Sequence, residues 1–234
     1  MAATDFPFYD GRPALVTGGR WWVVMLGLAA GYAALAAVPL PGILGVWVRA
    51  VLFAAIPLAV FIIVVPRHWR EILRPLRRGD LGWIVLFTVL CVLVLLTLGV
   101  LLAQVAGFSP NPLGTALREM STLDRLLIFL GLMPQLFGEE LLGLLPFLAL
   151  LHWLHHGRQL SRGTAVVLAS LGTVLVFGAA HLPTYDWNIV QCFVVVGSAR
   201  VVLLVAYVTT KTIWVPTGAH VLTDWTLFGL TLTA

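Results

Sequence analysis

Long runs of apolar residues, separated by short polar joins, make up most of the chain. Each run is close to the roughly 20 apolar residues that an α-helix needs to cross the hydrocarbon core of a bilayer. The runs cover residues 20–40, 43–65, 82–106, 124–152, 163–182, 187–209 and 212–232. Glycine and proline mark the joins between them. This pattern predicts an all-α, polytopic transmembrane helical bundle of about seven spans, or eight if one further segment is short or re-entrant.

The composition agrees with a membrane protein. Of the 234 residues, 60% are hydrophobic and 10% are charged, whereas soluble domains carry about 25% charged residues. We therefore expect a single integral membrane domain over residues 1–234. The first apolar run is long and lacks a small-residue cleavage site, so no removable signal peptide is expected. Cys91 and Cys192 lie in apolar runs, which favours two buried thiols over a disulfide or a metal site.

Positive charge gathers at particular joins of the predicted bundle. The net charge is +4, and a cluster of arginines lies between Arg67 and Arg78. Beside apolar helices, such a cluster is typical of a cytoplasmic loop that faces anionic lipids. Arg12, Arg20, Arg158, Arg162 and Lys211 fall on the same side if the N-terminus is cytoplasmic. We therefore expect a cytoplasmic N-terminus, and membrane lipids rather than nucleic acid as partners.

Ionisable residues interrupt four of the apolar runs. A charged side chain at the bilayer centre costs about 2.5–3.5 kcal/mol on insertion scales, so residues of this kind are functional candidates. They are Glu139 and Glu140 in the fourth run, His181 in the fifth, Arg200 in the sixth, and His220 with Asp224 in the seventh. Carboxylates and imidazoles together are the groups that activate water, with or without a metal ion.

Helical spacing sharpens these candidates. Glu139 and Glu140 point about 100° apart on a helix, so we expect one to face a reacting site and the other a structural partner. Residues four apart share a helix face. Two such pairs are Phe177 with His181 and His220 with Asp224.

Simpler interpretations exist for each residue taken alone. A single buried histidine is more often a hydrogen-bonded core residue than a catalyst, and Arg200 could serve only to neutralise a carboxylate. His152, His155 and His156 have the spacing of a metal-binding face but adjoin Arg158, which favours a solvated helix tail. The coincidence of several intramembrane sites favours function for the others.

The order of these residues resembles the CAAX prenyl endopeptidase and bacteriocin-processing (CPBP) family of intramembrane proteases. That family's pattern is a Glu-Glu pair followed by Arg, then Phe-x-x-x-His, then His-x-x-x-Asn or Asp. The matching residues here are Glu139-Glu140, Phe177 with His181, and His220 with Asp224. The resemblance covers a motif-bearing core of about residues 120–230 and implies a membrane-embedded endopeptidase, in a bacterial cytoplasmic membrane.

One position departs from the family pattern. The family's arginine would fall at position 144, where this chain has Leu144. A buried Glu140 then lacks its usual partner, and an unpaired buried charge is strongly unfavourable. We hypothesise that Arg200 supplies the guanidinium from the sixth run; the alternative is a protonated Glu140, its pKa raised by desolvation.

The resemblance also implies roles. The catalytic set would be Glu139, Glu140, His181, His220 and Asp224, supported by Phe177 and Arg200. Glu139 would be the general base on a water that His181 positions. His220 and Asp224 would lie near the developing oxyanion. Since an ionised Asp cannot donate a hydrogen bond, Asp224 must be protonated, orient His220 or bind a metal.

Cofactor and substrate are left open. No cofactor is required, although His181, His220, Glu139 and Asp224 would suit Zn²⁺; we favour a metal-free mechanism. The substrate would be a peptide or protein, with or without a lipid modification. The rival functions are a proton-coupled transporter or channel, and a non-catalytic peptide-binding or bacteriocin-immunity protein of the same family.

The catalytic interpretation makes a geometric demand. At about 1.5 Å per residue, His220 lies about 13 Å along its helix from Lys211, whereas His181 lies about 28 Å from Arg162. A shared site therefore requires tilted or broken helices, or a fifth span that begins deeper in the membrane.

Overall fold

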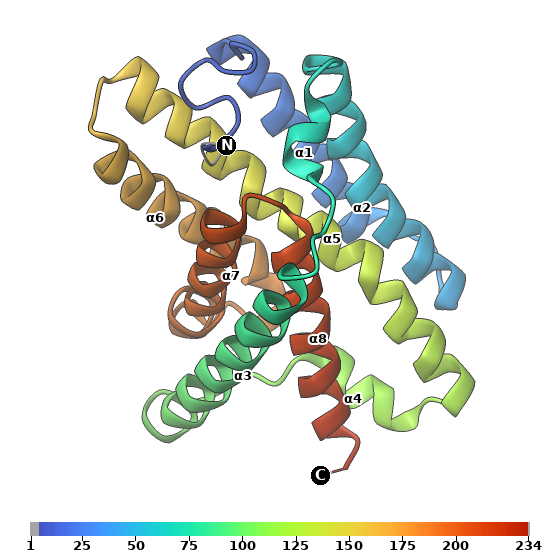
Figure 1. Cartoon of the computed structure of the whole chain (residues 1–234). Helices are drawn as coiled ribbons and strands as arrows, with labels where there is room; N and C mark the ends of the chain where they lie inside the picture. Colours follow the sequence, from blue (N-terminus) through green and yellow to red (C-terminus); the bar gives the residue numbers. More distant parts are fainter. Residues whose placement is uncertain (1–4, 234) are drawn as a thin grey trace.

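The computed structural model describes residues 5–233, and all regular structure in this part of the chain is helical (Figure 1). The main helices are α1 (Gly18–Ala37), α2 (Gly42–Val64), α3 (Asp80–Val105), α4 (Pro112–Glu119), α5 (Thr122–His152), α6 (Arg162–His181), α7 (Gly197–Thr210) and α8 (Trp214–Thr231). Short helical segments of other pitch are η1 (Trp69–Leu73), η2 (Trp153–Gly157), η3 (Pro183–Tyr185) and η4 (Gln191–Val196). The predicted all-α bundle is confirmed.

Within the described residues, six helices are long and apolar enough to cross a membrane: α1, α2, α3, α5 with η2, α6, and η4 with α7. These helices make the chain an integral membrane protein. The seventh predicted span forms α8, which is not among the six. Its two ionisable residues and several threonines make it less apolar. The eight-residue α4 is too short to cross a bilayer.

Helix α5 is the centre of the bundle. It runs diagonally through the molecule in Figure 1, and α1, α2, α6, α7 and α8 all contact it. Two glycines on α5 allow close approach. A Cβ atom on Gly138 would lie 2.7 Å from the Phe53 ring of α2, and one on Gly143 would lie 2.5 Å from the Arg200 guanidinium of α7. Small residues of this kind let membrane helices pack tightly.

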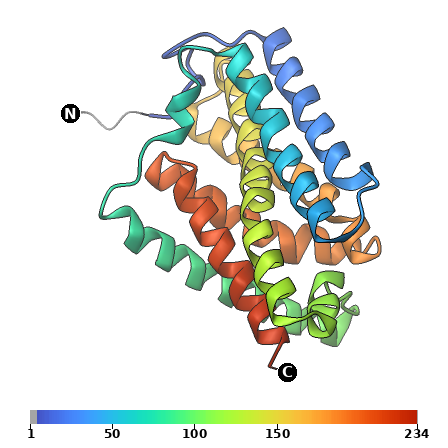
Figure 2. The ribbon, with the colours of Figure 1, turned by 90° about the vertical axis from the view of Figure 1, so that its right-hand side faces the viewer.

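The helices are inclined to one another, as a site shared by His181 and His220 requires. Helix α8 crosses α5 obliquely in both ribbon views (Figures 1 and 2). His181 is the last residue of α6, and His220 lies in the second turn of α8. Both side chains nevertheless reach the middle of α5, where Glu139 lies.

The N-terminal segment packs over the C-terminal end of α5. Phe6 and Phe8 are buried, and the carbonyl oxygen of Phe8 accepts a hydrogen bond from Nδ1 of His152 at 3.1 Å. His152 is itself buried, so the expectation of a solvated histidine tail is wrong for this residue. His156 is exposed, as that expectation requires. Hydropathy alone could not show that an N-terminal segment covers this helix end.

Candidate active site

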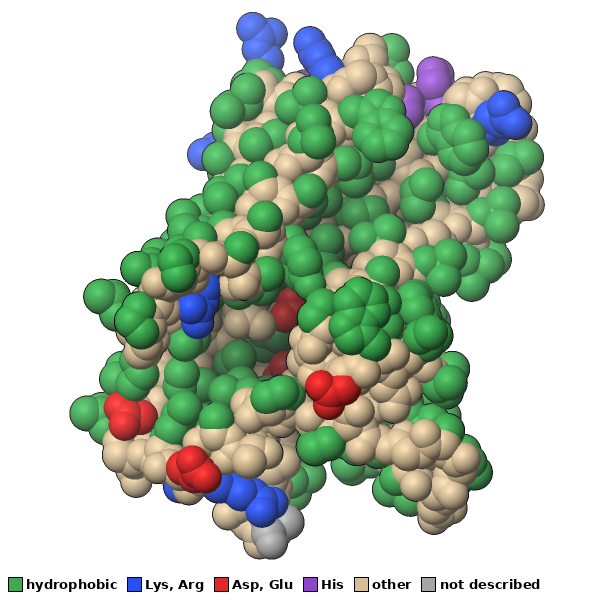
Figure 3. Space-filling model, turned by 180° about the vertical axis from the view of Figure 1, so that it is seen from behind, with side chains coloured by type: hydrophobic (Ala, Val, Ile, Leu, Met, Phe, Trp, Pro, Cys, Tyr) green, Lys and Arg blue, Asp and Glu red, His purple; other side chains and the backbone are tan. Residues whose placement is uncertain are grey.

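A cavity of about 1270 Å³ lies beside the middle of α5, and most of its lining residues are apolar. Its polar lining includes Glu139, His181, His220 and Asp224. Figure 3 shows the hollow from behind, with acidic side chains in red at its floor and apolar side chains around it. Residues far apart in the sequence therefore face one shared hollow.

Glu139 is the carboxylate of the pair that faces this cavity. Its Oε1 accepts a hydrogen bond from Nε2 of Gln135, one turn earlier on α5, at 3.1 Å. Its Oε2 lies 3.7 Å from Nε2 of His181 and 3.8 Å from Nε2 of His220. These two separations are too long for direct hydrogen bonds but are spans that one water molecule can bridge.

His181 is held in one orientation by its own helix. Its Nδ1 lies 2.8 Å from the carbonyl oxygen of Phe177, which can only accept, so Nδ1 carries the proton. The Phe177 ring packs against the imidazole with centroids 4.5 Å apart. This leaves Nε2 of the ring facing Glu139. The i, i+4 support predicted for this pair is present.

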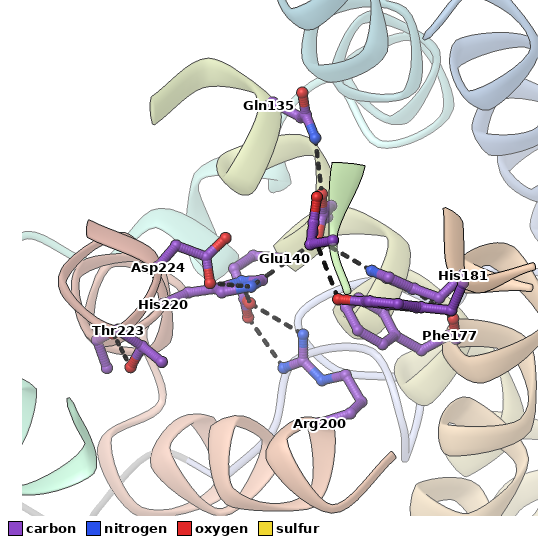
Figure 4. Close-up of polar contacts among 12 residues, drawn as sticks. Gln135, Glu140, Phe177, His181, Arg200, His220, Thr223 and Asp224 are labelled. Atoms are coloured by element: carbon purple, nitrogen blue, oxygen red, sulfur yellow. Dashed lines mark hydrogen bonds and ion pairs between the residues drawn. The ribbon is translucent and has the colours of Figure 1, made fainter. Parts of the chain in front are cut away.

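Glu140 points away from the cavity to a buried ion pair. Nη1 and Nη2 of Arg200 donate to its two oxygens at 3.0 and 2.9 Å, which is a bidentate contact. Nδ1 of His220 lies 2.8 Å from Oε1 of Glu140 and donates to it, because an ionised carboxylate only accepts. Figure 4 shows Arg200 rising from α7 and His220 entering from α8 toward Glu140. These contacts join α5, α7 and α8 through one buried polar cluster.

The predicted pairing of Arg200 with Glu140 is therefore present, and it accounts for Leu144. The Arg200 side chain is 1% exposed, and its guanidinium lies 5.3 Å from the centroid of the Phe177 ring. It passes over Gly143, whose missing side chain leaves the space. A guanidinium from α7 thus occupies the position that an arginine at 144 would supply from α5 itself. Glu140 has a charged partner and does not need a retained proton.

Glu140 makes the direct hydrogen bond to His220, whereas Asp224 lies farther from the ring. Oδ1 of Asp224 is 3.9 Å from Nε2 of His220, beyond hydrogen-bond distance but within reach of an ion pair, and Glu140 bonds the opposite ring nitrogen. The role of Asp224 in orienting His220 stays a prediction. Asp224 lines the cavity next to the reacting groups, as its labelled side chain shows in Figure 4.

The four residues expected to suit Zn²⁺ carry donor atoms of the right chemistry. In both histidines the Nδ1 proton is bonded to an oxygen acceptor, which leaves Nε2 directed at the carboxylate. Within the described residues, however, no three His, Cys, Asp or Glu side chains are grouped closely enough to hold a metal ion.

Sequence reasoning missed two residues of the site. Gln135 lies four residues before Glu139 and hydrogen-bonds it, which helical spacing could have indicated. Gly143 makes room for Arg200, but no local pattern reveals that role. By contrast, His155 and His156 lie at the far end of α5, in the segment η2, and take no part in the site.

The fold and the site define a class: a helical membrane protein whose glutamate and histidines meet in an intramembrane cavity. Residues 122–226, a little under half of the chain, match the family model described as type II CAAX prenyl endopeptidase Rce1-like. The segment is thus similar to a family of membrane proteases, in agreement with the resemblance of its motifs. The comparisons with curated proteins and with solved structures found no match.

Proposed function

We propose that the protein is an intramembrane endopeptidase in which Glu139 activates a water molecule for attack on a peptide bond. The observation that carries the proposal is the convergence of Nε2 of His181 and Nε2 of His220 on Oε2 of Glu139, at 3.7 and 3.8 Å. A water in that space would contact both a carboxylate base and an imidazole. The match of residues 122–226 to a CAAX endopeptidase family model supports the same reaction type.

Glu139 and His181 have different roles in the proposed hydrolysis. Glu139 takes a proton from water as the water oxygen bonds to the substrate carbonyl carbon. His181, fixed through its Nδ1 proton, positions this water and relays a proton to the leaving nitrogen when the carbon–nitrogen bond breaks. The products are a carboxylic acid and an amine. General acid–base groups of this kind contribute about 10²–10⁴-fold to a rate.

Glu140 and Arg200 act through position rather than by contact with substrate. Their bidentate pair holds Nδ1 of His220, so that Nε2 of His220 faces the cavity. A missing arginine at position 144 would favour a non-catalytic relative of the family, since it would leave Glu140 unpaired. Because Arg200 supplies a guanidinium there, that reason for preferring a binding scaffold no longer holds.

The apolar lining and the size of the cavity support a proposal for the class of substrate. Its lining is mainly apolar, its volume is about 1270 Å³, and the hydrolytic groups lie on its floor. It therefore suits an extended peptide segment of low polarity, or one that carries an apolar modification. The substrate is a membrane-associated peptide or protein, with or without a covalent lipid.

The experiment uses the purified full-length protein in lipid nanodiscs with quenched fluorescent peptides, both plain and prenylated. We expect hydrolysis by the wild type and a loss of about 10²–10⁴-fold in kcat for Glu139→Gln. Glu119→Gln is the matched control, because Glu119 is exposed on α4 and does not line the cavity. If no peptide is cleaved, or if Glu139→Gln cleaves as fast as the control, the protease proposal fails.

A further inference from the structure

Peptide hydrolysis makes one demand that the contacts among the motif residues do not address. The carbonyl oxygen becomes an oxyanion in the tetrahedral intermediate, and hydrogen-bond donors aimed at it are usually a large part of catalysis. Around the cavity floor, Glu139 offers acceptor oxygens, and the Nδ1 protons of His181 and His220 are bonded elsewhere. Asp224 donates only when it is protonated. An uncharged donor outside the motifs would therefore contribute to the site.

Tyr185 is placed to be that donor. It follows α6 in the segment η3, four residues after His181, and lines the same cavity. Its ring lies nearly parallel to the His181 imidazole, with centroids 6.4 Å apart and planes 17° apart. Burial raises the pKa of Tyr185 to about 12, and the charges of Asp224 and Glu139 add to this effect. The phenol therefore keeps its proton at neutral pH.

The hydroxyl proton of Tyr185 is also free to be used. The Oδ1 atom of Asn111 accepts a hydrogen bond from the backbone N–H of Leu113 at 3.0 Å, which settles the orientation of the amide. Its Nδ2 must then donate to the phenolic oxygen of Tyr185, 3.4 Å away. Tyr185 is the acceptor in that contact, so its own O–H proton is left for another acceptor, and the residue lines the cavity.

The backbone around Tyr185 is held in an uncommon conformation. The next two residues, Asp186 and Trp187, have φ angles of 50° and 59°, in the left-handed region that residues other than glycine rarely adopt. A pair of hydrogen bonds between Gln191 and the backbone of Ser109, at 2.9 and 2.8 Å, ties this loop to the segment before α4. Backbone strain of this kind clusters at functional sites, where the surrounding structure holds it in place.

We propose that Tyr185 is a catalytic residue that donates a hydrogen bond to the oxyanion of the tetrahedral intermediate. In this step the water oxygen bonds to the carbonyl carbon, Glu139 takes the water proton, and the carbonyl π electrons move onto the oxygen that Tyr185 contacts. When the intermediate collapses, those electrons re-form the C=O bond, the amine leaves with a proton, and Tyr185 keeps its own. The inference rests on the proposed hydrolysis, and Asn111 extends the site beyond residues 122–226.

A purely structural role for Tyr185 gives a different expectation. In that case the contact with Asn111 matters because it joins two loops, and breaking it from either side has the same effect. Asn111→Ser separates the two roles. Serine retains the capability to cap α4 but removes the amide that donates to Tyr185, while the phenol remains.

The test compares Tyr185→Phe with Asn111→Ser in the peptide assay. We expect Tyr185→Phe to lower kcat by about 10²-fold with KM changed less than about twofold, since loss of one oxyanion donor costs about 10²–10³ in kcat. Asn111→Ser should lower kcat by a factor less than about a tenth of the factor seen for Tyr185→Phe. Tyr207→Phe is the matched control, because that buried hydroxyl has no hydrogen-bond partner among the described residues.

A second measurement distinguishes the loss of the oxyanion contact from a folding defect. A phosphinic peptide, which carries a charged oxygen where the oxyanion forms, should bind Tyr185→Phe more weakly by a factor similar to the loss in kcat. Equal losses in Tyr185→Phe and Asn111→Ser, or unchanged phosphinate affinity, would overturn the role of Tyr185. If the wild type cleaves peptides and Glu139→Gln does not, such a result overturns the role of Tyr185 only, and the protease proposal is retained. A wild type without activity removes both proposals.

Discussion

Both carboxylate oxygens of Glu140 on α5 are bonded by the guanidinium of Arg200 on α7, at 3.0 and 2.9 Å. The two residues are 1% exposed and lie in separate helices. A pair this deeply buried is costly to break, because removal of one partner leaves an uncompensated charge. The pair therefore couples the packing of α5 and α7 to the orientation of His220.

Arg200→Met should lower the free energy of unfolding by about 3–5 kcal/mol, the range for breaking a buried ion pair. Addition of Leu144→Arg to that variant should recover part of the loss, because residues 140 and 144 share a helix face. Thermal and denaturant unfolding in detergent measures both. A double variant no more stable than Arg200→Met contradicts the view that Arg200 takes the place of an arginine at 144.

Gly143→Ala should displace the guanidinium, because the new Cβ would lie 2.5 Å from Nη1 of Arg200. Overpacking of this kind costs about 1–3 kcal/mol, and we expect peptidase activity to fall with it. Gly163→Ala is the control, since a Cβ at that position of α6 meets nothing within 4 Å. The two variants should differ clearly in unfolding temperature, and equal stability would count against a tightly packed Arg200.

Asp224→Asn should retain activity within about fivefold, because Asp224 lies 3.9 Å from His220 and makes no hydrogen bond to it. An amide at this position also offers a donor to the oxyanion, which a carboxylate lacks. Tyr185→Phe should therefore cost less in the Asp224→Asn background than in the wild type. Steady-state kcat values for the four proteins give the comparison, and strictly additive losses would argue against a shared oxyanion.

Chelators should leave peptidase activity unchanged. The expectation follows from the side-chain positions, since no three candidate ligands within the described residues group as a metal site requires. Incubation with 1,10-phenanthroline and then assay with the quenched peptides gives the answer. Activity that is lost and then restored by Zn²⁺ alone would show that the side chains rearrange around a metal.

The N-terminal segment contributes a pH-dependent contact. A hydrogen bond from Arg162 lowers the pKa of Asp5 to about 2, from 3.8. The stabilisation is thus present above about pH 4 and disappears as the pH falls toward 2. Because Asp5 is largely solvated, Asp5→Asn should cost no more than about 1 kcal/mol at neutral pH. Unfolding of the variant and the wild type should converge in acid; a constant difference would implicate another contact.

Much of this molecule could be predicted from the order of its residues. Apolar runs near 20 residues long predict membrane helices because an unpaired backbone is too costly in hydrocarbon. Glu139, His181 and His220 stood out because ionisable groups in such runs are rare. The split between Glu139 and Glu140 followed from a helical turn of about 100° per residue. These inferences need only local geometry and the bilayer as a solvent.

Other features were decided only when the helices packed. Helix α8 is inclined across α5, and the Nε2 atoms of His181 and His220 lie 3.7 and 3.8 Å from the same oxygen of Glu139. The partner of Glu140 is 60 residues away in the chain, and its placement depends on the space over Gly143. His220 donates from Nδ1 to Glu140 on another helix, whereas Asp224 on its own helix lies 3.9 Å from the other ring nitrogen. Such contacts depend on close packing between helices, and helical periodicity carries no information about the distance between them.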